Sequence, residues 1–156
     1  MRILVIEDEQ DLRQVLEYNL KGAGYEVLAA GRGDEGLRLA RDGHPDLVLL
    51  DLMLPDRPGL EILPEIKNFD QQLPVVVITA YSSVESAIEA MRGGAFHYVP
   101  KPFKNEEVLS LVRRAAERRA LVVENRDLRS RLEGMGEIVG TSRRMQEVFE
   151  LMRRAA

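Results

Sequence analysis

The chain has 156 residues, of which 45% are hydrophobic, and it contains no cysteine. This is enough apolar material for a hydrophobic core, while the missing cysteines exclude disulfides, thiolate zinc sites and cysteine nucleophiles. The net charge is -4, and residues 1–104 hold 17 acidic against 11 basic side chains, which argues against a nucleic-acid surface there. The sequence has no secretory signal and no apolar stretch of roughly 18 to 20 residues, so we expect a cytoplasmic protein without a membrane partner.

Short apolar runs alternate with helix-like segments from the first residues to about residue 105. The predicted strands are 3–6, 25–30, 47–50, 75–78 and 96–99, and the predicted helices between them are 10–21, 34–41, 60–69 and 84–91. Runs rich in Val, Ile and Leu are typical of parallel strands that are covered on both faces. The alternation predicts an α/β fold, a doubly wound five-stranded parallel sheet with helices on both faces.

Residues 105–133 contain neither Gly nor Pro and predict one long helix, whose first half can cover the sheet. Its second half has four residues at alternating four- and three-residue steps: Leu121, Asn125, Leu128 and Leu132. This spacing is that of a coiled-coil seam, in which a buried asparagine favours a parallel dimer in fixed register. About two heptads also fit a solvated amphipathic helix, so both interpretations stay open.

Residues 134–156 form a separate segment that begins with two glycines and ends in a short helix-like stretch. One face of that stretch is apolar, and no chain follows that could bury it. We therefore expect three parts, namely a domain over 1–120, a linker helix over 105–133 and the truncated start of a further domain over 134–156.

Four of the predicted strands lead into reactive side chains of complementary kinds. The residues that follow these runs are, in chain order, Glu7, Asp8, Asp51, Thr79 and Lys101. In an open parallel sheet, ligands bind in the crevice outside the carboxyl ends of the strands. We therefore expect three acids, a hydroxyl and an ammonium group to converge at one edge of the sheet.

The chemistry that suits this set is phosphoryl transfer to a carboxylate. Converging carboxylates repel one another unless a cation neutralises them, and their hard oxygen atoms suit Mg2+. Asp51 is the best nucleophile because it stands alone at the end of the central strand. A hydroxyl and an ammonium group, together with the metal, can hold the phosphoryl oxygens.

Four segments resemble the receiver domain of bacterial two-component response regulators: Val5–Glu9, Leu49–Pro55, Thr79–Ala80 and Tyr98–Phe103. The resemblance covers residues 1 to about 120. It implies a flavodoxin-like fold with strand order 2-1-3-4-5. It also implies a cognate sensor histidine kinase as phosphoryl donor and a homodimer as the switched species.

The resemblance also implies a role for each matching residue. Asp51 would be the phosphoacceptor and, together with Asp8, a direct Mg2+ ligand. Glu7 would act through water, and Met53 would offer its backbone carbonyl. The switch group comprises Thr79 and Lys101, which would bind phosphoryl oxygens, and Tyr98, the aromatic residue that turns inward when Thr79 moves. Lys101-Pro102 is expected to be a cis peptide.

Residues 137–148 resemble the opening of the ATPase domain of NtrC-type activators of sigma-54 RNA polymerase. The Gly-rich phosphate loop of such ATPases is missing from the chain, so we expect this fragment not to be an enzyme. The implied function is a phosphorylation switch that controls a downstream activator ATPase and hence transcription. Contacts with DNA and sigma-54 polymerase would then be made by further domains.

Three other functions fit parts of the sequence less well. Residues 31–36 read Gly-Arg-Gly-Asp-Glu-Gly, which matches the fingerprint of Rossmann-like nucleotide-binding domains, but two acids would face the pyrophosphate. The chain could also be a dimerisation module that is never phosphorylated, against which the intact acids, threonine and lysine argue. An aspartyl-phosphate hydrolase would need a second general acid two residues after Asp51, where Met53 stands.

Overall fold

The computed structural model describes residues 1–80 and 83–135, and side chains as far as residue 121. It contains a five-stranded parallel sheet in the order β2-β1-β3-β4-β5. The strands are β1 (Arg2–Ile6), β2 (Glu26–Ala30), β3 (Leu47–Asp51), β4 (Val75–Thr79) and β5 (His97–Pro100). The helices are α1 (Gln10–Gly22), α2 (Gly33–Asp42), α3 (Gly59–Phe69), α4 (Val84–Arg92) and α5 (Asn105–Met135). The predicted fold class and strand order are confirmed.

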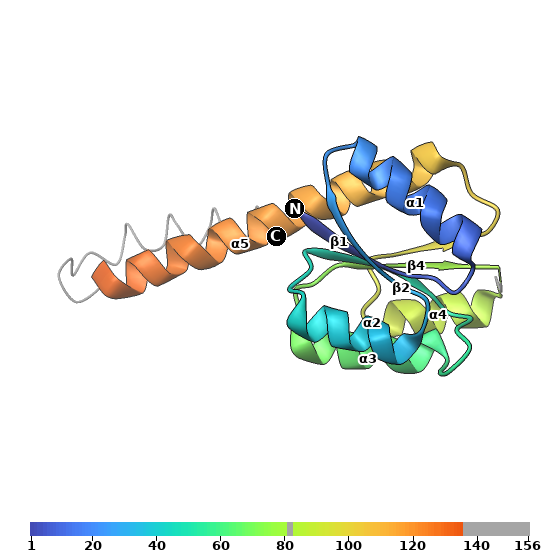
Figure 1. Ribbon diagram of the computed structural model, residues 1–156. Coiled ribbons are helices and arrows are strands. Elements are labelled where there is room, and N and C mark those ends of the chain that lie inside the picture. The colour runs from blue at the N-terminus through green and yellow to red at the C-terminus, as the bar shows by residue number, and fades with distance from the viewer. Residues whose placement is uncertain (81–82, 136–156) are drawn as a thin grey trace. The chain divides into compact units, whose positions relative to one another are not determined.

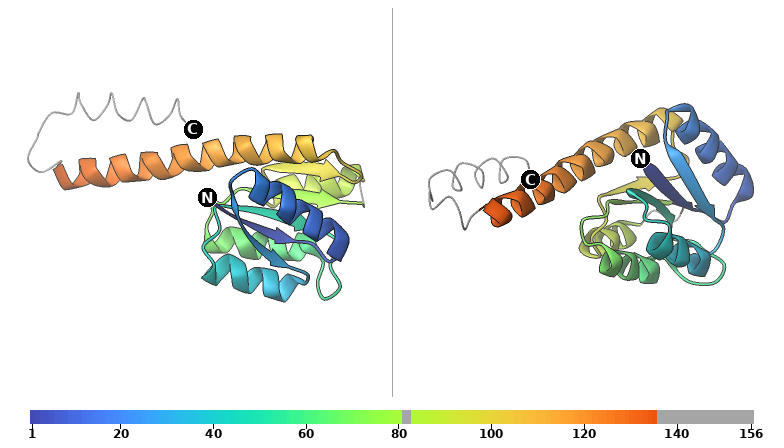
Figure 2. Two further views of the ribbon diagram at one scale, coloured as in Figure 1. Left: turned by 45° about the horizontal axis from the view of Figure 1, so that its top comes forward. Right: turned by 60° about the vertical axis from the view of Figure 1, so that its left-hand side comes forward.

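Helices cover both faces of the sheet (Figures 1 and 2). Helix α1 and the first turns of α5 lie on one face, and α2, α3 and α4 lie on the other. Each face buries its own apolar cluster, because β1, β3 and β4 send alternate side chains to opposite sides. Leu4 and Leu50 belong to the cluster under α2, α3 and α4, whereas Ile3 and Leu49 belong to the cluster under α1 and α5.

The observed elements agree with the predicted ones to within one or two residues at each end. Helix α5 extends two residues beyond its predicted end at residue 133, since it runs through Gly134 and ends at Met135. Two compact units divide the chain, Met1–Ala116 and Glu117–Ala156, and each is described by itself. In the described part of the chain, none of the helices combines the length and apolar character that a bilayer crossing needs.

The predicted coiled-coil residues lie mostly outside the described side chains. Leu121 is 42% exposed on α5, whereas Asn125, Leu128 and Leu132 fall within the helix but beyond the side chains described. The segment after Met135 lies outside the described residues altogether. The seam and the truncated further domain therefore stay predictions.

Candidate functional site

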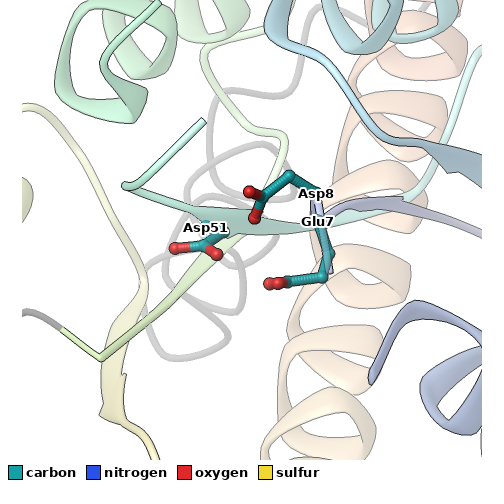
Figure 3. A group of neighbouring side chains, drawn as sticks. All are labelled: Glu7, Asp8 and Asp51. Carbon is teal, nitrogen blue, oxygen red and sulfur yellow. The ribbon is translucent and has the colours of Figure 1, made fainter. Parts of the chain in front are cut away.

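Three carboxylates meet at the carboxyl edge of the sheet, as the strand ends predict. Each of Glu7, Asp8 and Asp51 offers a carboxylate oxygen, and these oxygens lie within 4.8 Å of one another. Figure 3 shows the three side chains gathered beyond the ends of β1 and β3. Glu7 and Asp51 are buried, whereas Asp8 is exposed and gives the cluster its opening to solvent.

Lys101 supplies an ammonium group to the two buried acids. Its Nζ donates hydrogen bonds to both carboxylate oxygens of Glu7, at 3.0 and 3.1 Å, and to Asp51 Oδ2 at 3.0 Å. The lysine side chain is only 15% exposed, so these ion pairs are shielded from water. In this arrangement the lysine partly fulfils the need for a neutralising cation.

One ammonium group does not balance three carboxylates. The pKa of Glu7 is raised to about 7, because burial and the hydrogen bond with Asp51 raise it more than Lys101 lowers it. Burial alone would lower the pKa of Lys101, but its bonds to Glu7 and Asp51 raise it above the ordinary value. The excess of negative charge and the purely oxygen donor set fit a hard divalent cation such as Mg2+.

Backbone hydrogen bonds just beyond the strand ends fix these side chains. The N–H of Glu7 donates to the carbonyl of Ala30 at 3.0 Å, which continues the β1-β2 ladder, and Arg13 Nη1 donates to the carbonyl of Glu7 at 2.9 Å. The N–H of Lys101 donates to the carbonyl of Thr79 at 2.8 Å, which continues the ladder between β4 and β5. The charged groups therefore stand on the rigid part of the sheet.

The loop after β3 also contacts the acid cluster. The N–H of Met53 donates to Asp51 Oδ1 at 3.0 Å, which places the Met53 backbone beside the carboxylate. The Met53 side chain itself is 58% exposed. The Met53 backbone thus lies beside the carboxylate of Asp51, and its role as a metal ligand stays a prediction.

Thr79 ends β4, and Tyr98 lies on the neighbouring strand β5, where it pairs with Val77. Thr79 is fully buried at the end of β4, and Tyr98 is half-buried on β5. The Tyr98 hydroxyl lies 3.2 Å from Ser86 Oγ, within hydrogen-bonding distance. Ser86 also forms a reciprocal capping box with Ser83 at the start of α4. The aromatic residue is therefore connected to the N-terminus of α4.

Sequence reasoning missed Ser86 and its bond to Tyr98. A signal was present, because Ser83 and Ser86 have the spacing of a capping box before an amphipathic helix. It identifies the helix start but not the tyrosine, since the tyrosine comes from another strand. The expected cis peptide between Lys101 and Pro102 is confirmed.

The nucleotide-binding alternative meets an obstacle in the structure. The helix N-terminus that would receive a pyrophosphate is that of α2, and the N–H groups of Gly33 and Asp34 already donate to the carboxylate of Asp56, at 2.7 and 2.9 Å. A second anion there would meet this carboxylate. The geometry argues against a dinucleotide site at residues 31–36.

Comparison with known proteins agrees with this picture. Residues 3–113 match the family model of the response regulator receiver domain. The chain is 39% identical over 131 residues to the regulatory protein AtoC of Escherichia coli, which is 84% of this chain and 28% of that protein. It is 35% identical over 153 residues to the DNA-binding transcriptional regulator NtrC of Escherichia coli, which is 97% of this chain and 32% of that protein.

A solved structure shares the architecture. The CheY-like response regulator receiver domain protein of Methanospirillum hungatei JF-1 superposes with a TM-score of 0.74 at 27% identity, over 76% of this chain and 95% of that one. The present chain thus spans about a third of the length of the curated relatives, but nearly the whole of a solved receiver domain.

Proposed function

We propose that Asp51 of this chain, which belongs to the response regulator receiver domain family, is the phosphoacceptor of a Mg2+-dependent switch. A receiver domain is a regulatory phosphoacceptor domain and not a catalytic one. The observation that carries the proposal is the convergence of Glu7, Asp8 and Asp51 within 4.8 Å of one another, with Lys101 bonded to two of them.

We assign the metal to Asp8 and Asp51, with the backbone carbonyl of Met53 as a further ligand and Glu7 acting through water. When bound, Mg2+ supplies positive charge to the phosphoryl oxygens and to the acids around them. The protein's own part is to hold the Asp51 carboxylate at the mouth of the cluster, next to the exposed Asp8. Lys101 then shares its ammonium group between Glu7 and the arriving phosphoryl oxygens.

The proposed step is transfer from a phosphohistidine on a partner histidine kinase. A carboxylate oxygen of Asp51 forms a bond to phosphorus while the bond between phosphorus and the histidine nitrogen breaks. The kinase imidazole keeps the electron pair of that broken bond and takes a proton from solvent. The hydroxyl of Thr79, which is buried at the end of β4, would donate a hydrogen bond to an oxygen of the new phosphoryl group.

The readout that we propose runs through Tyr98. Movement of Thr79 toward the phosphoryl group would open space for the ring, and the ring would leave its bond with Ser86. The surface around α4 and β5 would thus exist in two states, and reversing a 1:99 ratio of states requires about 5.5 kcal/mol of preferential stabilisation.

The context that we propose is a sigma-54 activator. The resemblance of residues 137–148 to the start of an NtrC-type ATPase domain and the matches to AtoC and NtrC support it. The coiled-coil residues of α5, Leu121, Asn125, Leu128 and Leu132, would join two copies, and phosphorylation would rearrange this dimer. DNA and polymerase would be bound by domains outside this chain.

The test is phosphorylation of the purified chain with acetyl phosphate and Mg2+, followed by intact-mass measurement. We expect one added phosphoryl group on the wild type and none on Asp51→Asn, while Asp11→Asn, an acid of α1 outside the cluster, behaves like the wild type. Sedimentation and small-angle scattering with beryllofluoride then report the dimer. A wild type that dimerises but never accepts a phosphoryl group would instead indicate a phosphorylation-independent dimerisation module.

A further inference from the structure

The loop from Leu52 to Pro58 connects the phosphoacceptor to α3, and its two ends are tightly fixed. Met53 donates its N–H to Asp51 Oδ1 at 3.0 Å, and Gly59 donates its N–H to the carbonyl of Leu52 at 2.8 Å. A Cβ on Gly59 would lie 2.5 Å from the backbone oxygen of Asp51, so only glycine allows α3 to start this close to β3. Both ends of the loop are therefore held, one by β3 and the other at the start of α3.

The middle of the loop is held by Asp56, which binds the start of a different helix. Asp56 Oδ1 accepts from the N–H of Gly33 at 2.7 Å, and Oδ2 accepts from the N–H of Asp34 at 2.9 Å. Helix α2 begins after Arg32, whose side chain makes no capping hydrogen bond. Asp56 thus caps α2 from 22 residues away in the sequence, with a charged acceptor at the positive end of the helix.

The contact between this loop and α2 depends on a glycine. Gly33 is buried, and a Cβ there would lie 2.3 Å from Ile62 Cδ1 and 3.2 Å from Asp56 Oδ1. The hydrogen bonds from Gly33 and Asp34 also hold the pKa of Asp56 below its ordinary value, so the carboxylate stays charged at neutral pH. The backbone N–H groups of Gly33 and Asp34 therefore fix the position of the Asp56 carboxylate.

The next residue adds a second connection. Arg57 donates two hydrogen bonds to Glu65 on α3, at 2.9 and 3.1 Å, and lies 3.8 Å from the carboxylate of Asp34 on α2. These ion pairs are partly exposed to solvent and contribute little energy by themselves. They show that the loop bridges two helices, with Asp56 as the member whose hydrogen bonds satisfy otherwise unpaired N–H groups.

We infer that Asp56 is a positioning residue for the phosphoryl site, because its bonds to α2 hold the loop that carries the Met53 backbone beside Asp51. This rests on the proposed function in one respect, namely that the Met53 carbonyl belongs to the Mg2+ site. Only Leu54 and Pro55 lie between Met53 and Asp56, so the anchored Asp56 is close along the chain to the proposed metal ligand.

Removal of the Asp56 carboxylate removes the anchor in the middle of the loop. Binding Mg2+ must then order backbone that the wild type holds in place beforehand, and ordering even one residue is enough to weaken binding about fivefold. Asp56→Ala should therefore bind Mg2+ about fivefold more weakly. The Met53 amide should also exchange its hydrogen faster in the absence of Mg2+, because its bond to Asp51 opens more often.

A second variant separates positioning of the loop from capping of the helix. In Arg32→Asn/Asp56→Ala, the new asparagine stands at the N-cap of α2, where this residue type is preferred, and the net charge of the wild type is kept. Thermal unfolding should show stability regained relative to Asp56→Ala. Mg2+ affinity by calorimetry and protection of the Met53 amide by hydrogen exchange should stay low, because nothing anchors the loop again.

Ala40→Gly is the matched control, since it weakens α2 at its buried face without touching the loop. It should lose stability and keep wild-type Mg2+ affinity. The inference is overturned if Asp56→Ala binds Mg2+ within twofold of the wild type, or if the double variant regains affinity together with stability. A wild type that binds no Mg2+ would defeat the proposed function instead, while hydrogen exchange of the Met53 amide would still test the anchor.

Discussion

Charged side chains lie in different environments at the two ends of the sheet. At the amino end, Arg2 donates to Glu26 at 3.1 Å in an exposed ion pair, and its backbone N–H donates to Asp46 at 2.9 Å in a partly buried hydrogen bond. At the carboxyl end, Glu7 and Asp51 are buried with one lysine between them. Solvent screens the first set, whereas the second keeps an excess of buried charge, which is unfavourable for folding and useful for binding a cation.

The largest expected difference between the two ends concerns phosphorylation. Asp51→Asn should abolish the addition of a phosphoryl group, because an amide oxygen is a far weaker nucleophile than a carboxylate. Asp46→Asn, at the amino end, should leave the rate of addition unchanged. Intact-mass measurement after acetyl phosphate treatment checks both variants, and phosphorylation of Asp51→Asn to the wild-type level would show that the acceptor lies elsewhere.

The second prediction compares the cations of the two ends. Without Mg2+ at pH 8, Lys101→Met should lower the free energy of unfolding by about 3 to 5 kcal/mol, because it leaves two buried acids unpaired. Arg2→Met should lower it by less than about 1 kcal/mol, since its ion pair is exposed. Urea denaturation measures both values. Similar losses in the two variants would mean that burial makes no difference.

The third prediction concerns pH. The pKa of Glu7 is raised from 4.5 to about 7, so between these values the folded state holds a proton that the unfolded state has lost. The contribution of this proton to the free energy of unfolding is therefore complete below pH 4.5 and disappears as the pH rises through 7. It amounts to at most about 3 kcal/mol.

Glu7→Gln provides the reference for this measurement. Urea denaturation of wild type and variant at several pH values, without Mg2+, should show a wild-type stability that falls more steeply with rising pH. Added Mg2+ should reduce this fall, because the ion binds the charged carboxylate. Parallel curves for the two proteins would contradict the raised pKa of Glu7.

The smallest expected effect concerns the hydrogen bonds of Ser86 at the start of α4. Ser86→Ala removes half of the capping box of α4 and the partner of the Tyr98 hydroxyl, which should cost about 1 kcal/mol of stability. Glu26→Gln, which breaks only the exposed pair with Arg2, should cost less. The Tyr98 ring resonances in NMR spectra should change in the first variant only.

The sheet and the acid cluster could be predicted because both follow from local patterns. Apolar runs identify the strands, and the residue after each run is carried to a common edge by the parallel arrangement. Thus Asp51 and Lys101 could be placed near each other although 50 residues separate them. The bonds of Lys101 to both Glu7 and Asp51 could not be foreseen, since they depend on side-chain conformations at that edge.

The capping of α2 by Asp56 was beyond sequence reasoning for a different reason. A local cap is recognised by its position immediately before the helix, but this acceptor comes from a loop on another part of the chain. The sequence pattern at residues 31–36 even suggested a phosphate there, where the structure has a carboxylate. The pattern was correct in indicating an anion at a helix start and wrong about where the anion comes from.

The bonds of Lys101 have a consequence for the timing of assembly. They join residues 94 positions apart, from the end of the first strand to the end of the last. A growing chain on the ribosome cannot make them until its final strand has emerged and paired, because Lys101 follows that strand. A chain whose last strand has not yet paired therefore lacks the lysine that neutralises Glu7 and Asp51, and the acid cluster is completed only in the finished sheet.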